Sequence, residues 1–303
     1  MSRSEARLLA PAKVNLRLAV LGKRPDGYHE LDTTLLALDL ADELTVRADP
    51  GAGAVHLTVA EALDVPADAS NLAWRAAAAV LAEAGVDDVD LTLALRKRVP
   101  AAGGLGGGSS DAAAAALGAA EVLGERAREV DLVRLLAGLG SDCPFFLAAR
   151  ASGLGRCLGR GERVEPLARP PRWAVLIAAP ALPAPTPQVY AAWRPEDRAR
   201  EREAEPPDWA ALGAHEARAY LRNDLERAAL RAVAGLARWR ELLDRSGLAH
   251  ALLSGSGSSF FALFDDPEEA REAELRLRVA ANSEGLRACA VTAAAGAGVQ
   301  RLD

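Results

Sequence analysis

The chain has 303 residues, half of them hydrophobic, so it is long enough to fold as two domains, or as one large one, around a real core. Its 36 basic and 42 acidic side chains give a net charge of −6, which disfavours a general nucleic-acid or membrane-surface binder. The only lysines are Lys13, Lys23 and Lys97, so any chemistry that needs an ammonium group falls on these three.

Short alternating runs and longer helical runs interleave along the chain, without internal repeats, which predicts a mixed α and β protein. Alternation predicts strands over Val14–Val20, Leu44–Val46, Val55–Val59, Leu91–Leu95, Trp173–Ala179, Ala251–Leu253 and Phe260–Phe264. Helical periodicity, with Gly85 and Gly124 after the first two, predicts helices over Asn71–Ala84, Ser109–Leu123, Val130–Leu139, Glu216–Leu236 and Pro267–Ala280. Charges and prolines predict an exposed insertion over Arg194–Asp208, and we expect a domain boundary near Arg169–Arg172.

The first strand carries polar residues on one face. Val14 and its alternate neighbours share the apolar face, while Lys13, Asn15 and Arg17 share the other. A lysine two residues from an asparagine could meet a phosphate and a hydroxyl together. A solvated strand face explains the pattern equally well, and the scarcity of lysine favours the functional interpretation slightly.

A turn follows this strand at Pro25-Asp-Gly27, and Tyr28 and His29 come directly after it. A tyrosine can stack on a planar base, and a histidine can offer a donor and an acceptor to the edge of a base. Ordinary packing is the alternative interpretation for this pair.

The strongest single feature is the glycine-rich segment Pro100–Ser110, between a predicted strand and an alanine-rich helix. Its glycines let successive N–H groups converge, and a helix N-terminus behind them favours an anion, which predicts a phosphate cradle. The spacing fits neither GxxxxGK[ST] nor GxGxxG, so a P-loop and a dinucleotide fold are disfavoured. A flexible linker is the alternative, but Ser-Ser-Asp before helix-forming alanines predicts a capped helix start.

Asp142 lies in Gly140–Phe146, just past a predicted helix end and beside an apolar Pro-Phe-Phe run. Such a carboxylate, held rigidly and partly shielded from water, can accept a proton from an attacking hydroxyl or orient it. A plain turn aspartate is the alternative.

Nothing in the sequence indicates export or membrane insertion. The longest apolar stretch, Ala174 to Pro185, is short and broken by prolines, and Met1–Arg7 does not look like a signal peptide. Cys143, Cys157 and Cys289 are odd in number and lack CxxC spacing, which indicates neither a disulfide framework nor a zinc site. We therefore expect a cytoplasmic protein without membrane or nucleic-acid partners.

Three segments of the chain together resemble motifs of the GHMP kinases, which phosphorylate small molecules with ATP: Pro11–Asn15, Pro100–Ser110 and Ser254–Gly257. Arg24–Glu30, Gly140–Phe145 and Gly159–Glu162 narrow the resemblance to a member that acts on the 2-hydroxyl of a substrate with a cytidine diphosphate group, in isoprenoid precursor biosynthesis. The resemblance implies a two-lobed α+β fold with a ferredoxin-like C-terminal lobe. The active site would lie between an N-terminal lobe over residues 1–168 and a C-terminal lobe over 169–303.

The resemblance also assigns roles. It places Asp142 against the substrate hydroxyl, with Lys13 as its cationic partner, and Asn15, Tyr28 and His29 at the cytidyl end. Thr186 would lie near the catalytic pair, although a helix N-cap before Pro187 explains it as well. The residues implied at ATP are Pro100, Ala101, Ala102, Gly103, Gly104, Leu105, Gly106, Gly107, Gly108, Ser109, Ser110 and Asn71, which also suits a helix N-terminus. Ala101-Ala102 departs from the more glycine-rich entry of some members.

The resemblance further implies Mg²⁺, with Ser109, Ser110 and water open as ligands, and a monomer or a homodimer. Ser254–Gly257 would close on the site, or form a hairpin turn between two strands. Other functions stay open: another GHMP kinase acting on mevalonate, homoserine or a sugar, or a non-catalytic nucleotide-binding relative. A nucleotide-dependent oxidoreductase is disfavoured by the missing dinucleotide spacing.

Overall fold

The computed structural model describes residues 4–62, 64–198, 207–281 and 284–302. Its strands are β1 (Glu5–Lys23), β2 (His29–Pro50), β3 (Val55–Ala60), β4 (Val89–Arg96), β5 (Leu154–Gly159), β6 (Arg163–Pro166), β7 (Ala174–Pro180), β8 (Arg222–Asn223), β9 (Leu252–Leu253), β10 (Phe260–Phe264), β11 (Leu286–Ala293) and β12 (Gln300–Leu302). Its α-helices are α1 (Leu72–Ala84), α2 (Gly107–Leu123), α3 (Leu132–Leu139), α4 (Phe145–Ala148), α5 (Thr186–Ala192), α6 (Ala214–Ala217), α7 (Glu226–Ala232), α8 (Leu236–Arg245) and α9 (Pro267–Ala280). Short 3-10 turns η1 to η4 cover Gly124–Ala127, Pro195–Asp197, Trp209–Ala211 and Arg218–Tyr220.

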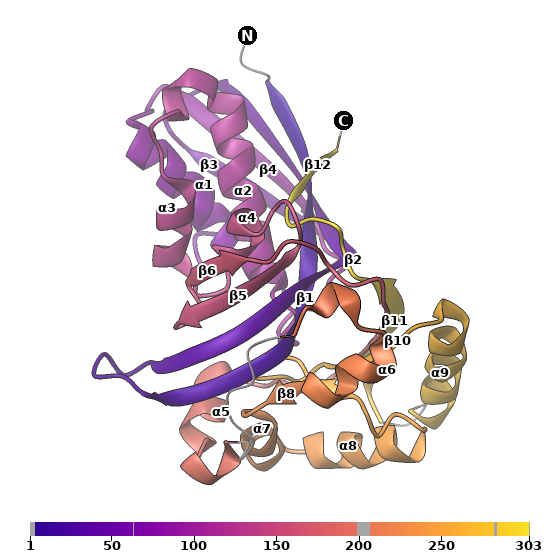
Figure 1. The fold of residues 1–303 in the computed structure, drawn as a ribbon. Coiled ribbons are helices and arrows are strands. Elements are labelled where there is room, and N and C mark those ends of the chain that lie inside the picture. The colour runs from indigo at the N-terminus through magenta and orange to yellow at the C-terminus, as the bar shows by residue number, and fades with distance from the viewer. Residues whose placement is uncertain (1–3, 63, 199–206, 282–283, 303) are drawn as a thin grey trace.

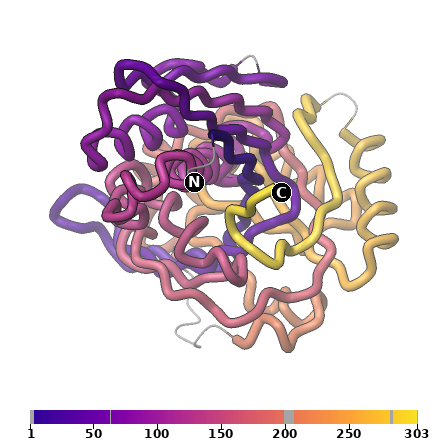
Figure 2. Tube along the Cα trace, turned by 90° about the horizontal axis from the view of Figure 1, so that it is seen from above, coloured from indigo at the N-terminus to yellow at the C-terminus, as the bar shows by residue number. Residues whose placement is uncertain are grey.

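The strands form two sheets (Figure 1). The larger has the order β12-β1-β2-β4-β3, with β5 and β8 pairing on β2 and β1 and β6 pairing on β5. Helices α1 to α4 pack on it and enclose one hydrophobic core. The smaller sheet has the order β11-β7-β10-β9, with α5, α7, α8 and α9 packed on it. Figure 2 shows the C-terminal segment lying beside the first strand, where β12 pairs with β1.

The smaller sheet is buried on both faces, which explains why β7 and β10 are continuous apolar runs. Alternate residues, such as Leu176 and Ala262, face the helices. The others, such as Ile177 and Phe261, pack against Val14 and Leu16 of β1. The predicted apolar face of the first strand is therefore confirmed at Val14 and Leu16, whose burial turns Lys13 and Asn15 the other way. It is wrong at Leu18 and Val20, which lie past a register shift and pack in the other core.

Ladder irregularities bracket the Lys13 segment. The pairing of β1 with β2 shifts register between Pro11 and Lys13, and again between Asn15 and Arg17. Such bulges bend a strand and re-aim its side chains, and they are common beside functional sites. Lys13, Val14 and Asn15 thus form a short regular stretch between two irregularities.

Most predicted elements are confirmed, and β1 to β4 are longer than the patterns indicated. Asn71 caps α1 by accepting a hydrogen bond from the Ala73 amide at 2.9 Å, and Gly85 ends the helix in the left-handed conformation. The predicted capping of the second long helix by its serines is wrong. Its N-cap is Gly106, so α2 begins at Gly107 and its serines lie inside the first turn.

The predicted helix over Glu216–Leu236 is wrong as a single helix: the segment forms α6, η4, β8 and α7, and α8 begins only at Leu236. The break comes from tertiary hydrogen bonds at Asn223 and Asp224. The Asn223 side chain donates to the carbonyls of Leu253 and Gly255. The Asp224 backbone N–H donates to the carbonyl of Leu18, and the Asp224 carboxylate accepts from the backbone N–H of Val20. Asn and Asp side chains often compete with the helix in this way.

Of the predicted insertion Arg194–Asp208, residues 199–206 lie outside the described part of the chain. The segment is exposed at Arg194, but Asp197 is buried and accepts a 2.9 Å hydrogen bond from Arg231. The division into lobes at residue 168 stays a prediction; β12 and β8, which come later in the chain, pair with β1. No helix in the described ranges is long and apolar enough to cross a membrane.

Close packing of α2 on the large sheet yields a stability prediction. A Cβ on Gly118 would lie 2.7 Å from Val46 Cγ2 and 2.8 Å from Leu8 Cδ1, inside a filled core. We expect Gly118→Ala to destabilise the fold by about 1–2 kcal/mol, because overpacking outweighs the ~1 kcal/mol gain in helix propensity. The matched control is Gly138→Ala in α3, where a Cβ meets nothing within 4 Å and a small gain is expected. Equal shifts of the two chemical-denaturation midpoints would contradict the prediction.

Candidate active site

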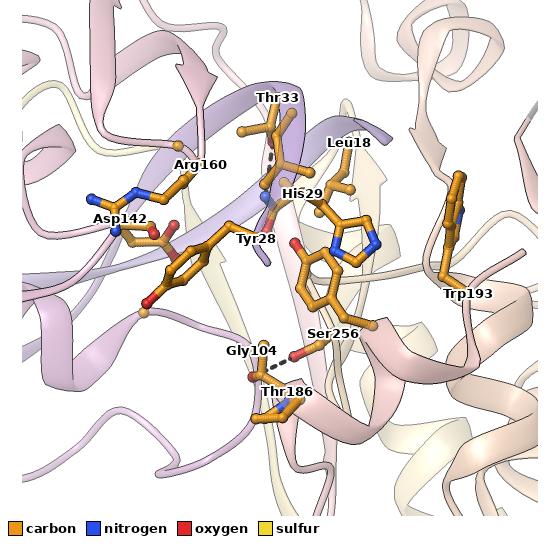
Figure 3. A pocket seen from close by; sticks show the side chains of 18 of the residues that line it. Leu18, Tyr28, His29, Thr33, Gly104, Asp142, Arg160, Thr186, Trp193 and Ser256 are labelled. Atoms are coloured by element: carbon orange, nitrogen blue, oxygen red, sulfur yellow. Dashed lines mark hydrogen bonds between the residues drawn. The ribbon is translucent and has the colours of Figure 1, made fainter. Parts of the chain in front are cut away.

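A cavity of about 790 Å³ lies where the two sheets meet. Its walls come from β1 and β2, the glycine-rich loop, the turn after α3, the turn between β5 and β6, helix α5, and the loop after β9. Figure 3 shows Asp142, Arg160 and Tyr28 gathered on one side and His29 and Trp193 on the other. Segments far apart in sequence therefore converge on one space.

Lys13 lies at one end of this cavity and is only 3% exposed. Its Nζ donates to Asn15 Oδ1 at 2.7 Å and to the Gly104 carbonyl at 2.9 Å, and it lies 3.3 Å from Asp142 Oδ2. An ammonium has three N–H bonds, and here each has an acceptor. The predicted pair of Lys13 and Asp142 is thus in contact, with the Asp142 side chain one-third exposed toward the cavity.

The glycine-rich loop wraps closely around Lys13. Gly104 and Gly106 have φ of 75° and 71°, a conformation that L side chains rarely adopt. A Cβ on Gly106 would lie 2.8 Å from Lys13 Cγ, and one on Gly104 would lie 2.2 Å from the Ser254 carbonyl. Because α2 begins at Gly107, its first N–H groups have no partner within the helix and form an anion-binding surface.

The loop after β9 holds the glycine-rich loop from the other side. Ser254 Oγ donates to the Gly104 carbonyl at 2.9 Å, and the Ser259 amide donates to the Gly103 carbonyl at 3.0 Å. Ser256 lines the cavity, and its hydroxyl lies 2.9 Å from that of Thr186 (Figure 3). Thr186 is the first residue of α5, after the N-cap Pro185, so its side chain makes this contact and does not cap the helix.

Aromatic side chains form the far end of the cavity. The His29 ring stacks on Tyr190, with centroids 5.0 Å apart, and meets Trp193 edge-on at 5.7 Å. Burial, with a smaller contribution from Lys23, lowers the pKa of His29, so the ring is neutral at neutral pH with one donor and one acceptor nitrogen. Tyr28 is 53% exposed, and the Arg160 guanidinium lies 4.9 Å from the centre of its ring.

Only some of the other predicted site residues line the cavity. Gly104, Gly106 and Ser109 line the cavity. Asn71 does not; its amide group also donates to the Pro66 carbonyl, so its capping role is confirmed and a contact with ATP stays a prediction. Ser110 is fully buried, and its hydroxyl has no hydrogen-bond partner among the described residues.

The lining residues that sequence reasoning missed include Thr33, Arg160, Tyr190 and Trp193. Arg160 lies inside the Gly159–Glu162 motif, which could have singled it out. Tyr190 and Trp193 carried a weaker signal, the presence of two aromatic side chains in a chain only 4% aromatic. No sequence signal pointed to Thr33, because its role depends on its hydrogen bond to Asn15 across the β1–β2 ladder.

A buried charge cluster lies beneath the start of α2. Lys97 Nζ lies 2.7 Å from Asp111 and also pairs with Asp42, which further accepts from the backbone N–H of Val99 at 2.8 Å. A Cβ on Gly107 would come within 3.2 Å of Lys97 Nζ, so the ammonium lies directly under the first residue of the helix. One cation thus forms ion pairs with two carboxylates. Asp111 Oδ1 has no hydrogen-bond partner in the part of the chain described.

Two family models match the chain: the GHMP kinases N terminal domain over residues 71–150 and the GHMP kinases C terminal domain over 202–282. Relatives named 4-diphosphocytidyl-2-C-methyl-D-erythritol kinase include one from Thermus thermophilus, 41% identical over 89% of this chain and 92% of its own length. Another, from Geobacter metallireducens, is 39% identical over 88% of this chain and 92% of its own.

Two solved structures are also similar to this chain over nearly its whole length. A 4-(cytidine 5'-diphospho)-2C-methyl-D-erythritol kinase superposes with a TM-score of 0.75 and 39% identity, covering 96% of this chain and 100% of its own. A homoserine kinase from Cytophaga hutchinsonii has a TM-score of 0.70 and 16% identity, covering 100% of this chain and 98% of its own. The second likeness concerns the fold alone.

The charge cluster yields a pH prediction. Burial raises the pKa of Asp111 to about 8, with Lys97 opposing the rise and Asp42 adding to it. From about pH 4 to about pH 8 the folded protein therefore keeps a proton that the unfolded chain releases, so this group makes stability fall as pH rises through that window. Asp111→Asn removes the effect. We expect wild-type stability to decline relative to the variant between about pH 5 and pH 8 and to level off above, as measured by urea denaturation.

The control for this experiment is Asp88→Asn, at an exposed carboxylate whose pKa is lowered mainly by hydrogen bonding to Arg126. That group is ionised in both states over the whole window, so its stability difference from the wild type should not change with pH. A pH-independent difference for Asp111→Asn as well would overturn the prediction.

Proposed function

The chain belongs to the GHMP kinase family, and on that premise we propose that it transfers the γ-phosphate of ATP to the 2-hydroxyl of 4-diphosphocytidyl-2-C-methyl-D-erythritol, in non-mevalonate isoprenoid precursor biosynthesis. It is a small-molecule kinase, and ATP is its phosphate donor. One observation carries the choice of acceptor: a single cavity contains the Lys13–Asp142 pair beside the glycine-rich loop and the aromatic side chains of Tyr28 and His29.

At the reactive end, Asp142 faces the acceptor hydroxyl and either accepts its proton or orients it for attack. Lys13 stabilises the charge that develops between this hydroxyl and the γ-phosphate. The support is their 3.3 Å separation, the burial of Lys13 and the opening of Asp142 to the cavity. Most of the rate enhancement then comes from positioning and charge stabilisation, and no covalent intermediate on the protein is needed.

The phosphates of ATP would lie on the loop Pro100–Ser110. The glycine positions there leave space that a Cβ would fill, and the start of α2 presents N–H groups to an anion. Mg²⁺ is part of the proposal because it would supply positive charge that offsets the negative charge of the phosphates. The described residues contain no cluster of three acidic, histidine or cysteine side chains for a metal. In the proposal, Mg²⁺ would be held by phosphates, water and the hydroxyl of Ser109 or Ser110.

At the other end, the cytidyl group would stack on Tyr28, with neutral His29 reading the edge of the base. Arg160 already covers one face of Tyr28 and lies with Asp142 on the same side of the cavity (Figure 3). We place the substrate diphosphate near this guanidinium, because it lines the cavity and a guanidinium is a strong hydrogen-bond partner for phosphate oxygens. Asn15 and Thr186 complete the proposed substrate site, with Asn15 next to Lys13 at the reactive end and not at the cytidyl end that the resemblance implied. We retain the lobes 1–168 and 169–303 as part of the proposal.

Another GHMP kinase activity, on mevalonate, homoserine or a sugar, is the alternative. A coupled ADP-release assay with the cytidyl acceptor beside those three acceptors separates the possibilities. Release with the cytidyl acceptor alone supports the proposal, and release with one of the others but not with it overturns the choice of substrate. No release with any acceptor would favour a non-catalytic relative.

The catalytic pair yields a prediction. Asp142→Asn and Lys13→Ala should each lower kcat by ~100- to 10,000-fold with the fold intact, because each removes a group that acts on the reacting atoms. Circular dichroism checks the fold, and Asp87→Asn at an exposed position serves as the control. A near-normal rate in either variant would remove that residue from the proposed mechanism.

The proposed cytidyl-binding end of the cavity yields another testable prediction. Tyr28→Ala should raise KM for the cytidyl acceptor by about 5- to 100-fold, in line with a lost base-stacking contact, and leave KM for ATP within about twofold. Tyr220→Ala is the matched control, because Tyr220 is also exposed and does not line the cavity. Equal losses for acceptor and ATP would argue against a base-binding role.

A further inference from the structure

We propose that Thr33 is a positioning residue for the reaction: acting through Asn15, it fixes the direction of the Lys13 ammonium. Thr33 lies on β2, where it pairs with Leu18, just past the register shift that follows Asn15 in β1. The inference rests on the proposed function in one respect, namely that the Lys13 ammonium acts on the transferred phosphoryl group.

The chain of hydrogen bonds begins at a backbone carbonyl. The Thr33 hydroxyl donates its one hydrogen to the carbonyl of Arg17 at 2.6 Å. That carbonyl lies at the register shift between Asn15 and Arg17 in the β1–β2 ladder. With its hydrogen committed there, the Thr33 oxygen can only accept, and it accepts from Asn15 Nδ2 at 2.9 Å.

The orientation of the Asn15 amide follows from this. Its NH₂ group must face Thr33, so its Oδ1 faces the other way, toward Lys13 Nζ at 2.7 Å. The reversed orientation would put two donors against an ammonium that can only donate, and would leave the Thr33 oxygen against Oδ1. Thr33 and Lys13 therefore each favour the same orientation of the Asn15 amide.

The consequence reaches the reactive end of the cavity. The other two N–H bonds of Lys13 point to the Gly104 carbonyl and to Asp142. Asn15 is thus the third point that fixes the ammonium group. All three residues of the chain Thr33, Asn15 and Lys13 are 3% exposed, so water cannot readily replace a lost partner. Small displacements of a catalytic group lower rates strongly, by up to about 100-fold for 1 Å.

The first test compares two neighbouring threonines. Thr33→Val keeps the shape and removes the hydroxyl; we expect kcat to fall by about 5- to 50-fold, with KM for ATP and acceptor within about twofold. Thr33→Ser should restore most of that loss. Thr34→Val is the matched control, because Thr34 is also buried, does not line the cavity, and its hydroxyl has no partner among the described residues. A rise in KM without a fall in kcat would mean that Thr33 contacts substrate directly and would overturn the inference.

A double-mutant cycle tests whether Thr33 acts through Asn15. In an Asn15→Ala background, Thr33→Val should cause little further loss of kcat, because the link between them is already broken. The same fold-loss in both backgrounds would show an independent role and overturn the inference.

A readout separate from turnover uses the scarcity of lysine. With ¹⁵N-lysine labelling the chain gives three side-chain ammonium signals, and Lys13→Ala identifies that of Lys13. Thr33→Val should shift or broaden that signal, and Thr34→Val should leave it in place. These signal changes are expected whether or not the wild type phosphorylates the cytidyl acceptor. A failure to phosphorylate it would refute the proposed function alone. An unchanged Lys13 signal in Thr33→Val, with the fold intact, would refute the Thr33 inference alone.

Discussion

A single buried ammonium organises the site. Lys13 Nζ meets acceptors on its own strand, on the glycine-rich loop and on the turn after α3, and these segments are far apart in sequence. A buried cation without partners is costly, so desolvation of this group favours the arrangement in which all three segments come together. The Gly104 carbonyl also accepts from Ser254, which adds the loop after β9 to the same junction. The geometry of the cavity thus follows from satisfying one charge.

The same junction explains how an acidic chain can accept phosphate-rich ligands. The net charge of −6 describes the whole surface, whereas the cavity is lined by Lys13, Lys23 and Arg160 and adjoins the start of α2. Backbone N–H groups at a helix start attract anions without adding a formal charge. Selectivity for a particular polyanion therefore depends on local dipoles and a few placed cations, and the excess of acidic groups elsewhere discourages nonspecific ones.

The features that could be predicted from the sequence are those set by local chemistry. Asn71 and Gly85 mark the ends of α1 because caps act within one turn, and the alternation along β1 separated Lys13 and Asn15 from Val14 and Leu16. What escaped prediction depends on distant partners. The helix expected over Glu216–Leu236 breaks where Asn223 and Asp224 bind β1 and the loop after β9, and no periodicity contains that information. Tyr190 and Trp193 reach the cavity only because α5 docks beside the β1–β2 hairpin.

The pairing of β12 with β1 has a consequence for how the chain is made. Arg7, near the start of the sheet, is hydrogen-bonded to a strand that contains Leu302. During synthesis residues 5–23 emerge well before residues 300–302, so this edge of β1 exists long before its neighbour does. An unpaired edge strand is a template for wrong pairing, and contacts this distant in sequence form slowly. The large sheet therefore gains its β12 pairing only after residue 302 has been synthesised, and until then that edge of β1 is exposed, because β2 pairs with the opposite edge.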